Sequence, residues 1–130
     1  MTDGTIIPNT ALVLGAKMRT GEAVAPSHIV LGEGSATPTE DSVGVQTEVL
    51  RKLATISRIG SEVCYEIVVA EGELDASVSE MALTNAATGL GDCDFLDVFA
   101  SSPQICDSDH GAIFRIYRDQ IGRASCRERV

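Results

Sequence analysis

The sequence predicts a mainly β fold, an antiparallel β-sandwich or barrel-like domain with room for one short helix near its N-terminus. Stretches in which apolar and polar residues alternate recur along the chain, and the clearest is EVCYEIVVA at residues 62–70. Connections that carry Gly, Asp or Pro separate these stretches, as is typical of antiparallel sheets. Apolar residues make up 44% of the 130 residues and Trp is absent, so the predicted core is mainly aliphatic and large enough for one domain.

The first elements are predicted from residue spacing near the N-terminus. The stretch TALVLGAKMRT favours a short helix that starts at about Asn9, whose side chain suits an N-cap, and that Gly15 and Gly21 limit. Further along, the alternation in HIVLG predicts a strand that ends at the turn glycines Gly32 and Gly34.

A loop and a hairpin are predicted next. Residues 35–44 combine Pro, Ser, Thr, Gly and acidic residues, which is typical of a loop. In TEVLRKLATISRIGS the spacing of Glu48 and Lys52 is compatible with a helix, whereas the β-branched residues before Gly60 and Ser61 indicate the first arm of a hairpin. We expect the hairpin, with EVCYEIVVA as its second arm.

The second half of the chain is predicted to add three strands, which are the stretches VSEMALT, DFLDVFAS and GAIFRIYRD. In the first of them, Met81 and Leu83 share one face and Glu80 lies on the other. The intervening segments NAATGLGDCD and SSPQICDSDHG are predicted to be loops, because they are rich in Gly, Asp, Ser and Asn.

The charge of the chain speaks against nucleic acid as a partner. The formal net charge is −9, but residues 121–130 hold three Arg and one Glu. The rest of the chain therefore carries seven basic against eighteen acidic residues, a formal charge of −11. Such an acidic surface repels phosphate backbones, so nucleic-acid binding is not expected.

The cysteines and the apolar runs bear on the expected compartment. The cysteines at positions 64, 93, 106 and 126 form no CxxC pair, which favours free thiols in a reducing compartment. No apolar run approaches the roughly 20 residues that a membrane-spanning helix needs. The N-terminus also lacks the basic start and long apolar run of a signal peptide. We therefore expect a soluble protein that is made in the cytoplasm and has no membrane partner.

One cluster holds side chains that could ligate a metal ion: Asp107, Asp109 and His110, close to Cys106. They are weak candidates, because a zinc site needs four ligands and a calcium loop needs more oxygen ligands and a central Gly. The alternative is an acidic loop whose Asp side chains accept hydrogen bonds from its own backbone. Cys106 and His110 could also act as nucleophile and base, although neighbours on a turn usually point apart.

The remaining polar residues predict no catalytic residue and no cofactor. The segments LGEG and GLGD fit neither the GxGxxG nor the Walker pattern of phosphate-binding loops. Glu48 with Arg51, and Glu66 with Glu80, are expected to lie on a solvated strand face. We therefore expect a protein that is not an enzyme.

The order of the elements resembles bacteriophage tail proteins of the tail-collar fibre type. Over residues 10–119 the chain shows HIVLGEG, a Thr/Pro loop, TEVLRK, an alternating strand, SEMALTNAATG, a strand leading to FASSPQI, and a final strand. The residues that match this family's turns and strand patterns are Gly32, Gly34, Glu48, Arg51, Glu80, Leu83 and Gly89. Ala82 and Thr84 depart from the family's usual Gly and Phe, and Cys106 with the DSDH segment departs from its usual basic residue.

The resemblance implies a virion structural role without catalysis, as an assembly or spacer domain of a tail fibre or tail tip of a phage or prophage. It implies assembly in the host bacterial cytoplasm, and as partners further copies of the chain and other tail or baseplate proteins. The alternative is a small carbohydrate- or receptor-binding module of a tail fibre, which the presence of only two Tyr and three Phe disfavours. A metal-binding or hydrolytic domain that uses the Asp107–His110 loop is the third alternative.

The C-terminal segment is expected to be foreign to the domain. The string IGRASCRERV at residues 121–130 resembles the in-frame translation of a common short-read sequencing adapter. We therefore divide the chain into a β domain at residues 1–119, expected to be truncated near Asp119, and an adapter-derived segment at residues 120–130. The basic character and the fourth cysteine of that segment carry no functional argument.

Overall fold

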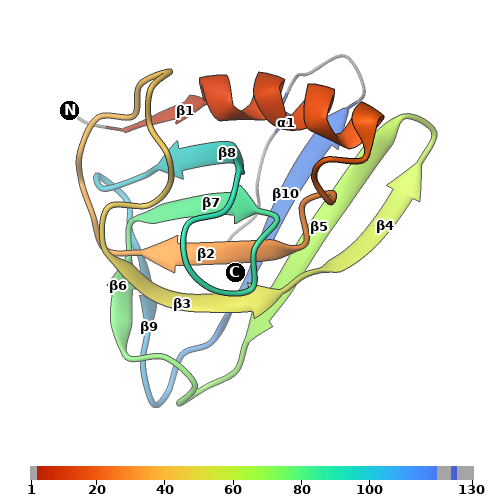
Figure 1. Cartoon of the computed structure of the whole chain (residues 1–130). Helices are drawn as coiled ribbons and strands as arrows, with labels where there is room; N and C mark the ends of the chain where they lie inside the picture. Colours follow the sequence, from red (N-terminus) through yellow and green to blue (C-terminus); the bar gives the residue numbers. More distant parts are fainter. Residues whose placement is uncertain (1–2, 120–123, 126–130) are drawn as a thin grey trace.

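The computed structural model describes residues 3–119 and 124–125, and in this part of the chain one helix accompanies a set of mostly short strands (Figure 1). The elements are β1 (Gly4–Ile6), α1 (Asn9–Thr20), β2 (His28–Gly32), β3 (Glu48–Leu53), β4 (Thr55–Ile59), β5 (Glu62–Val69), β6 (Ala76–Val78), β7 (Glu80–Thr84), β8 (Cys93–Val98), β9 (Gln104–Cys106), β10 (Ala112–Asp119) and β11 (Ala124–Ser125). The structure confirms the predicted fold class, a mainly β protein with antiparallel sheets and one short helix near the N-terminus.

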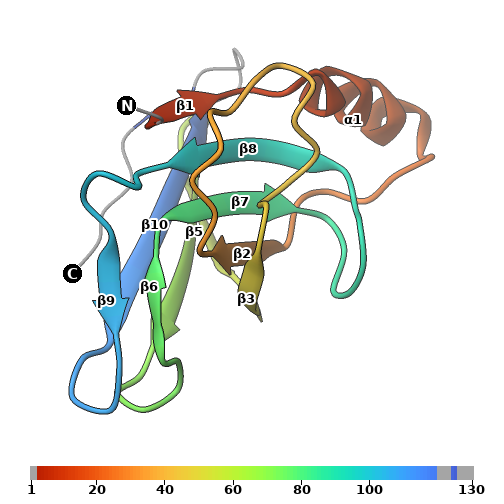
Figure 2. The same ribbon diagram turned by 90° about the vertical axis from the view of Figure 1, so that its left-hand side faces the viewer.

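The strands form two larger sheets and one small ribbon. The first sheet has the order β1-β8-β7-β2-β3, the second has the order β11-β10-β5-β4, and β6 pairs with β9. Every pairing is antiparallel. In Figures 1 and 2 the strands of the second sheet cross behind those of the first at a steep angle, which is one of the two ways in which twisted sheets pack face to face.

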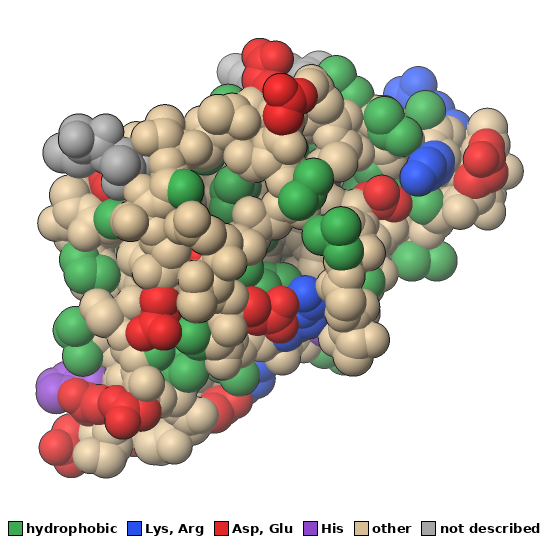
Figure 3. Space-filling view, turned by 60° about the vertical axis from the view of Figure 1, so that its left-hand side comes forward, with side chains coloured by type: hydrophobic (Ala, Val, Ile, Leu, Met, Phe, Trp, Pro, Cys, Tyr) green, Lys and Arg blue, Asp and Glu red, His purple; other side chains and the backbone are tan. Residues whose placement is uncertain are grey.

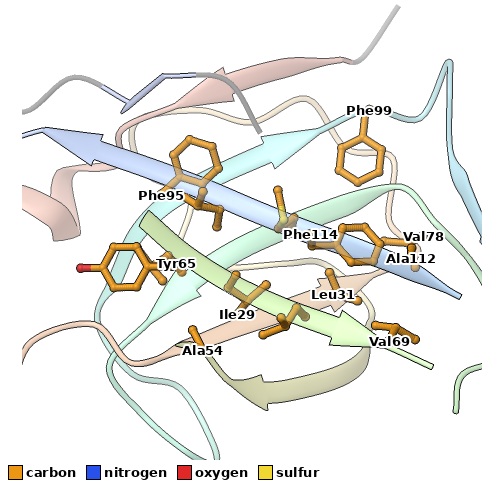
Figure 4. Packing of buried hydrophobic residues seen from close by; sticks show 14 of the residues in the cluster. Ile29, Leu31, Ala54, Tyr65, Val69, Val78, Phe95, Phe99, Ala112 and Phe114 are labelled. Carbon is orange, nitrogen blue, oxygen red and sulfur yellow. The ribbon is translucent and has the colours of Figure 1, made fainter. Parts of the chain in front are cut away.

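The main core lies between the two larger sheets (Figure 4). Its buried side chains come from strands of both sheets and include Ile29, Leu31, Tyr65, Ile67, Val69, Met81, Leu83, Phe95, Phe114 and Ile116. The alternation of the sequence thus produces this core directly, because every second residue of β2, β5 and β10 points between the sheets.

A second, smaller apolar cluster lies on the outer face of the first sheet. It consists of Val30, Ala82, Cys93 and Leu96, the side chains that point away from the main core. Figure 2 shows the loop before β3 passing over this face, and α1 beside β8 at the edge of the sheet. The Thr10 hydroxyl of α1 donates a hydrogen bond of 2.6 Å to the Cys93 carbonyl, which fastens the helix to β8.

Three residues were expected to bound the helix, and the structure agrees with the prediction at only one of them, Gly21. Pro8, in an extended conformation, precedes the first helical residue, so the expectation that Asn9 is the N-cap was wrong. Gly15 lies inside the helix, because burial of Ala11 and Leu14 offsets the roughly 1 kcal/mol by which Gly disfavours a helix. Gly21 ends the helix as predicted, in the left-handed conformation with φ +78°.

Short strands account for the other differences. The predicted loop SSPQICDSDHG contains β9, and the predicted strand VSEMALT is divided at Ser79 into β6 and β7. The N-terminal strand β1 was not predicted. Each of β1, β6 and β9 has three residues, which is too short to show an alternating pattern in the sequence.

One continuous segment contributes to both sheets. It forms β3 in the first sheet, crosses over at Ala54, and forms β4 in the second sheet. The Ala54 N–H donates to the Ser27 carbonyl at 2.8 Å, and the Ala54 side chain is buried. The predicted hairpin between β4 and β5 is confirmed, and the helical alternative for this segment is not formed.

Candidate functional site

The carboxylate of Glu80 is buried and held by backbone amides. Only 2% of this residue is exposed. One carboxylate oxygen accepts hydrogen bonds from the amides of Gly34 at 2.6 Å and Thr47 at 2.9 Å, and the other accepts one from Gln46 at 2.8 Å. The expectation that Glu80 lies on a solvated strand face was wrong, because the loop before β3 folds over β7 and supplies the donors that a buried carboxylate needs.

Two glycines make room for this carboxylate. A Cβ at Gly32 would lie 2.7 Å from the Glu80 Cγ and 2.7 Å from the Thr47 carbonyl oxygen, and a Cβ at Gly34 would lie 2.5 Å from the Gln46 Cβ. Both would also clash with a Glu80 carboxylate oxygen. The site is therefore filled by its own loop, and its chemistry is that of a structural anchor for residues 33–47.

Arg51 performs a similar role for the loop between β7 and β8. Its Nη1 donates to the carbonyl oxygens of Ala86 at 3.0 Å and Gly89 at 2.8 Å, and its Nε and Nη2 donate to the Glu48 carboxylate at 3.2 and 2.7 Å. The Arg51 side chain is only 12% exposed, so the expectation of a solvated Glu48–Arg51 pair was wrong for the arginine. Gly89 presents its carbonyl from a left-handed conformation with φ +71°.

A cavity of about 250 Å³ lies between these two anchored loops, on the outer face of the first sheet. Figure 3 shows a hollow in this face, with hydrophobic side chains inside it and charged side chains nearby. The lining residues are Val30, Val43, Gly44, Val45, Glu48, Arg51, Ala82, Thr84, Gly89, Leu90, Gly91 and Cys93. The buried Thr84 hydroxyl has no hydrogen-bond partner among the described protein atoms. The sequence contains one sign of this cavity, because Val43 and Leu90 are apolar residues within predicted loops.

The Asp107–His110 loop is exposed and self-contained. The Asp107 carboxylate accepts hydrogen bonds from the Asp109 amide and from the His110 Nδ1, each at 2.8 Å. This pairing lowers the pKa of Asp107 and raises the pKa of His110. The described residues contain no group of three His, Cys, Asp or Glu side chains that could hold a metal ion. The arrangement is that of an acidic loop in which an Asp side chain binds its own backbone.

The Cys106 thiol and the candidate base His110 lie in different surroundings. Cys106 is buried in the main core, whereas His110 is exposed, so the structure does not bring them together as nucleophile and base. Burial raises the pKa of Cys106, and it raises the pKa of Cys93 to about 11. Burial also raises the pKa of the half-buried Cys64. At neutral pH these three thiols are protonated, which makes them poor nucleophiles.

The other paired charges are structural. Glu66 binds Arg115 across β5 and β10 at 2.6 Å, and it lies in a different sheet from Glu80, so the two glutamates form no carboxylate pair. Arg118 of β10 makes two hydrogen bonds to Asp94 of β8, at 2.8 and 3.2 Å, and so links the two sheets. Both side chains of this second pair are largely buried.

The strand β4 is an exposed edge that sequence reasoning did not single out. All five of its residues are exposed. Among the described residues β4 pairs with β5 alone, so its other edge presents backbone N–H and C=O groups to solvent. Ile56 and Ile59 of β4 are exposed by 50% and 84%, and Leu53, the last residue of β3, is exposed by 69%. The sequence gives one indication of this exposure. The apolar residues Leu53, Ile56 and Ile59 are three residues apart, whereas a strand with one buried face has apolar residues at every second position.

Comparison of the chain with protein-family models, curated proteins and solved structures gave no match. Among the described residues, no helix has the length and apolar character that crossing a membrane requires. The family resemblance of the sequence therefore stays a prediction, and the functional argument depends on the geometry of the chain itself.

Proposed function

We propose that this chain is a non-catalytic structural protein of the phage tail, an assembly or spacer domain of a tail fibre or tail tip. The observation that carries the proposal is the exposed edge at β4, flanked by exposed Leu53 and containing Ile56 and Ile59. An unpaired edge with exposed apolar side chains is a surface suited to pairing with another chain.

The use of the buried polar groups supports the non-catalytic part of the proposal. Glu80 accepts three backbone amides, Arg51 binds two carbonyls and Glu48, and Arg118 binds Asp94. Each of these groups is engaged in fixing a loop or a sheet. A catalytic carboxylate or base would instead be directed toward a site where a substrate can bind.

The phage-tail part of the proposal has its support in the residues that carry the resemblance. Gly32, Gly34 and Glu80 meet in one structural cluster, and Glu48, Arg51 and Gly89 meet in another. In each cluster, residues that are far apart in the sequence anchor one loop, either residues 33–47 or the loop between β7 and β8. The proposed partners are other tail or baseplate proteins and further copies of the chain, in a virion assembled in the host bacterial cytoplasm.

A small binding module is the second candidate, and the cavity beside Thr84 is the observation that favours it. Sugar-binding sites commonly offer an aromatic ring against which the apolar face of the ligand packs. None of the described residues that line this cavity is aromatic. The assembly role is therefore the stronger proposal of the two.

The experiment is a pair of measurements on the purified chain. Light scattering coupled to size-exclusion chromatography, over a wide range of protein concentrations, is expected to show a defined oligomer. Binding to a glycan array is expected to be absent. A chain that stays monomeric and binds a glycan would contradict the assembly role and support the binding module. A bound metal whose removal by a chelator unfolds the protein would instead revive the metal-binding alternative.

A further inference from the structure

We propose that the cavity between the two anchored loops (Figure 3) binds a small neutral molecule with an apolar body and one hydroxyl group. Simple phenols and short cyclic alcohols belong to this class of ligand. The inference goes beyond the proposed assembly role and does not depend on it, because the residues that line the cavity all belong to one copy of the chain.

The cavity has an apolar floor and an apolar mouth. Val30, Ala82 and Cys93 form the floor, and they come from the adjacent strands β2, β7 and β8 and are at most 4% exposed. Val43 and Leu90 belong to the two loops and are 52% and 77% exposed. A ligand that covers these two side chains removes apolar surface from water, which favours its binding.

The volume of the cavity sets the size of the ligand. A cavity of about 150 Å³ with an apolar lining is large enough to bind benzene. The present cavity of about 250 Å³ therefore has room for one substituted ring. It is smaller than the sites of roughly 300–1,000 Å³ that take drug-sized ligands.

One polar group of the lining has no partner within the protein. The Thr84 hydroxyl is buried and accepts or donates no hydrogen bond among the described protein atoms. It lies beside Gly91, since a Cβ added to Gly91 would be 2.5 Å from the Thr84 Oγ1, and both residues line the cavity. Because an unpaired buried hydroxyl costs free energy, a ligand hydroxyl that pairs with it stabilises the complex.

The charges of the lining favour a neutral ligand. Arg51 donates hydrogen bonds to Glu48 at 3.2 and 2.7 Å, and its Nη1 binds two backbone carbonyls, so its guanidinium is committed to protein groups. The net charge of −9 repels anions. An ionised ligand of either sign would also lose its hydration in a cavity with an apolar floor.

Hydrogen bonds fix both loops next to the cavity. Glu80 holds the loop before β3 at Gln46, which directly follows Val45 of the lining. Arg51 holds the loop between β7 and β8 at Gly89, which directly precedes Leu90. A ligand therefore needs to order little of the chain, and this preorganisation favours measurable binding of a small molecule.

The experiment is a titration of the full chain with p-cresol, followed by NMR of the methyl groups. We expect saturable shifts at Val43 and Leu90, with a dissociation constant of roughly 1 mM or below. Benzoate, which has a similar size and a negative charge, is expected to bind at least about fivefold more weakly.

Two variants locate the site and a third is the matched control. Ala82→Leu fills the floor and is expected to abolish binding of p-cresol. Leu90→Asp places a charge at the mouth and is expected to weaken binding at least about fivefold, and it puts the fold at little risk because Leu90 is exposed. Ile105→Asp, at an exposed position of β9 outside the lining, should bind like the unchanged chain. Circular dichroism checks that each variant is folded.

Thr84→Val tests the hydroxyl. The change keeps the shape of the side chain and removes a group that has no partner in the protein, so the fold is expected to be retained. The affinity for p-cresol relative to that for toluene, which lacks the hydroxyl, is expected to fall at least about fivefold. An unchanged ratio would overturn the role of Thr84 in selecting a hydroxyl-bearing ligand.

The remaining outcomes decide the site itself. The inference is overturned if p-cresol causes no saturable shifts up to its solubility limit, or if Ala82→Leu and Leu90→Asp both leave its binding unchanged. Binding of methyl β-galactoside in place of p-cresol would overturn it and support the carbohydrate-binding alternative. The oligomeric state of the chain tests the assembly role separately, so failure of one proposal is distinguishable from failure of the other.

Discussion

At the scale of single residues, the buried carboxylate of Glu80 shows how much a loop can change the role of a charged side chain. Seen in its strand, Glu80 is a polar residue on the face opposite Met81 and Leu83, which is the usual place of a solvated glutamate. Its actual partners are amides of Gly34, Gln46 and Thr47, which belong to a different part of the chain. The carboxylate therefore orders the loop that covers it.

Replacing Glu80 by Gln tests this role. The change keeps the shape of the side chain but turns an NH₂ group toward backbone amides that need an acceptor. We expect the free energy of unfolding to fall by about 2–3 kcal/mol, the scale of a charge-assisted hydrogen bond that is lost inside a protein. Urea unfolding measures this change. Glu62→Gln, at an exposed position of β5, is the control and should alter the unfolding free energy by less than about 0.5 kcal/mol.

The pair of Asp107 and His110 predicts a pH dependence with a definite sign. The carboxylate raises the pKa of His110, so the attraction stabilises the loop at pH values below the ordinary His pKa and is lost as the pH rises through the raised value. The pKa of Asp107 is lowered, so its contribution is present above the ordinary Asp pKa and is lost as the pH falls through the lowered value. The pair therefore acts in the mildly acidic range between these two limits.

An NMR titration of His110 measures the upper limit of this range. We expect His110 to titrate above the ordinary His pKa of about 6.5. Asp107→Asn should lower the pKa of His110, because the carboxylate that raises it is removed. An unchanged pKa of His110 in this variant would show that the two side chains do not interact in solution.

At the scale of elements, the sequence predicts what alternation and turn residues determine, and the rest depends on contacts between distant segments. The strands β2, β5, β8 and β10 are predictable because their apolar residues follow a period of 2 over most of their length. The crossing of residues 48–59 from one sheet to the other at Ala54 is not predictable from local sequence. It involves a hydrogen bond from the Ala54 N–H to the carbonyl of Ser27, which is distant in the sequence. The candidate site obeys the same rule: its residues were named from motifs, but the cavity and the β4 edge arise only when the loops and sheets are placed in space.

The helix offers a test of propensity against packing. Gly15 lies on the exposed side of α1, and a Cβ added there would meet no heavy atom within 4 Å. We expect Gly15→Ala to raise the free energy of unfolding by about 0.5–1 kcal/mol, since Ala favours the helix and restricts the unfolded chain. Urea or thermal unfolding measures this. Gly32→Ala is the contrasting variant, and it should destabilise the protein because its Cβ would clash with Glu80 and Thr47.

At the scale of the whole molecule, the division of the chain at residue 119 predicts that the domain folds independently of the C-terminal segment. The buried residues of the main core lie between positions 29 and 116. The segment at residues 120–130 lies outside the described residues, except for Ala124 and Ser125, which pair with β10. The adapter origin of this segment therefore stays a prediction.

Removal of residues 120–130 tests this division. We expect the shortened chain to keep its circular dichroism spectrum and to lose less than about 1 kcal/mol of its unfolding free energy, because the core remains complete. Chemical denaturation of both forms measures the difference. A shortened chain that no longer folds would show that the segment belongs to the domain.

The segment at residues 48–59 has a mechanical consequence for any assembly that contacts the chain through β4. Because one stretch of backbone passes from the first sheet into the second, a pulling force applied to β4 is transmitted along covalent bonds through Ala54 into β3. There Arg51 passes part of that tension to the loop at residues 86–89, and the hydrogen bonds between β3 and β2 resist it in shear. A partner that binds at β4 would thus load both sheets of the chain and not the second sheet alone.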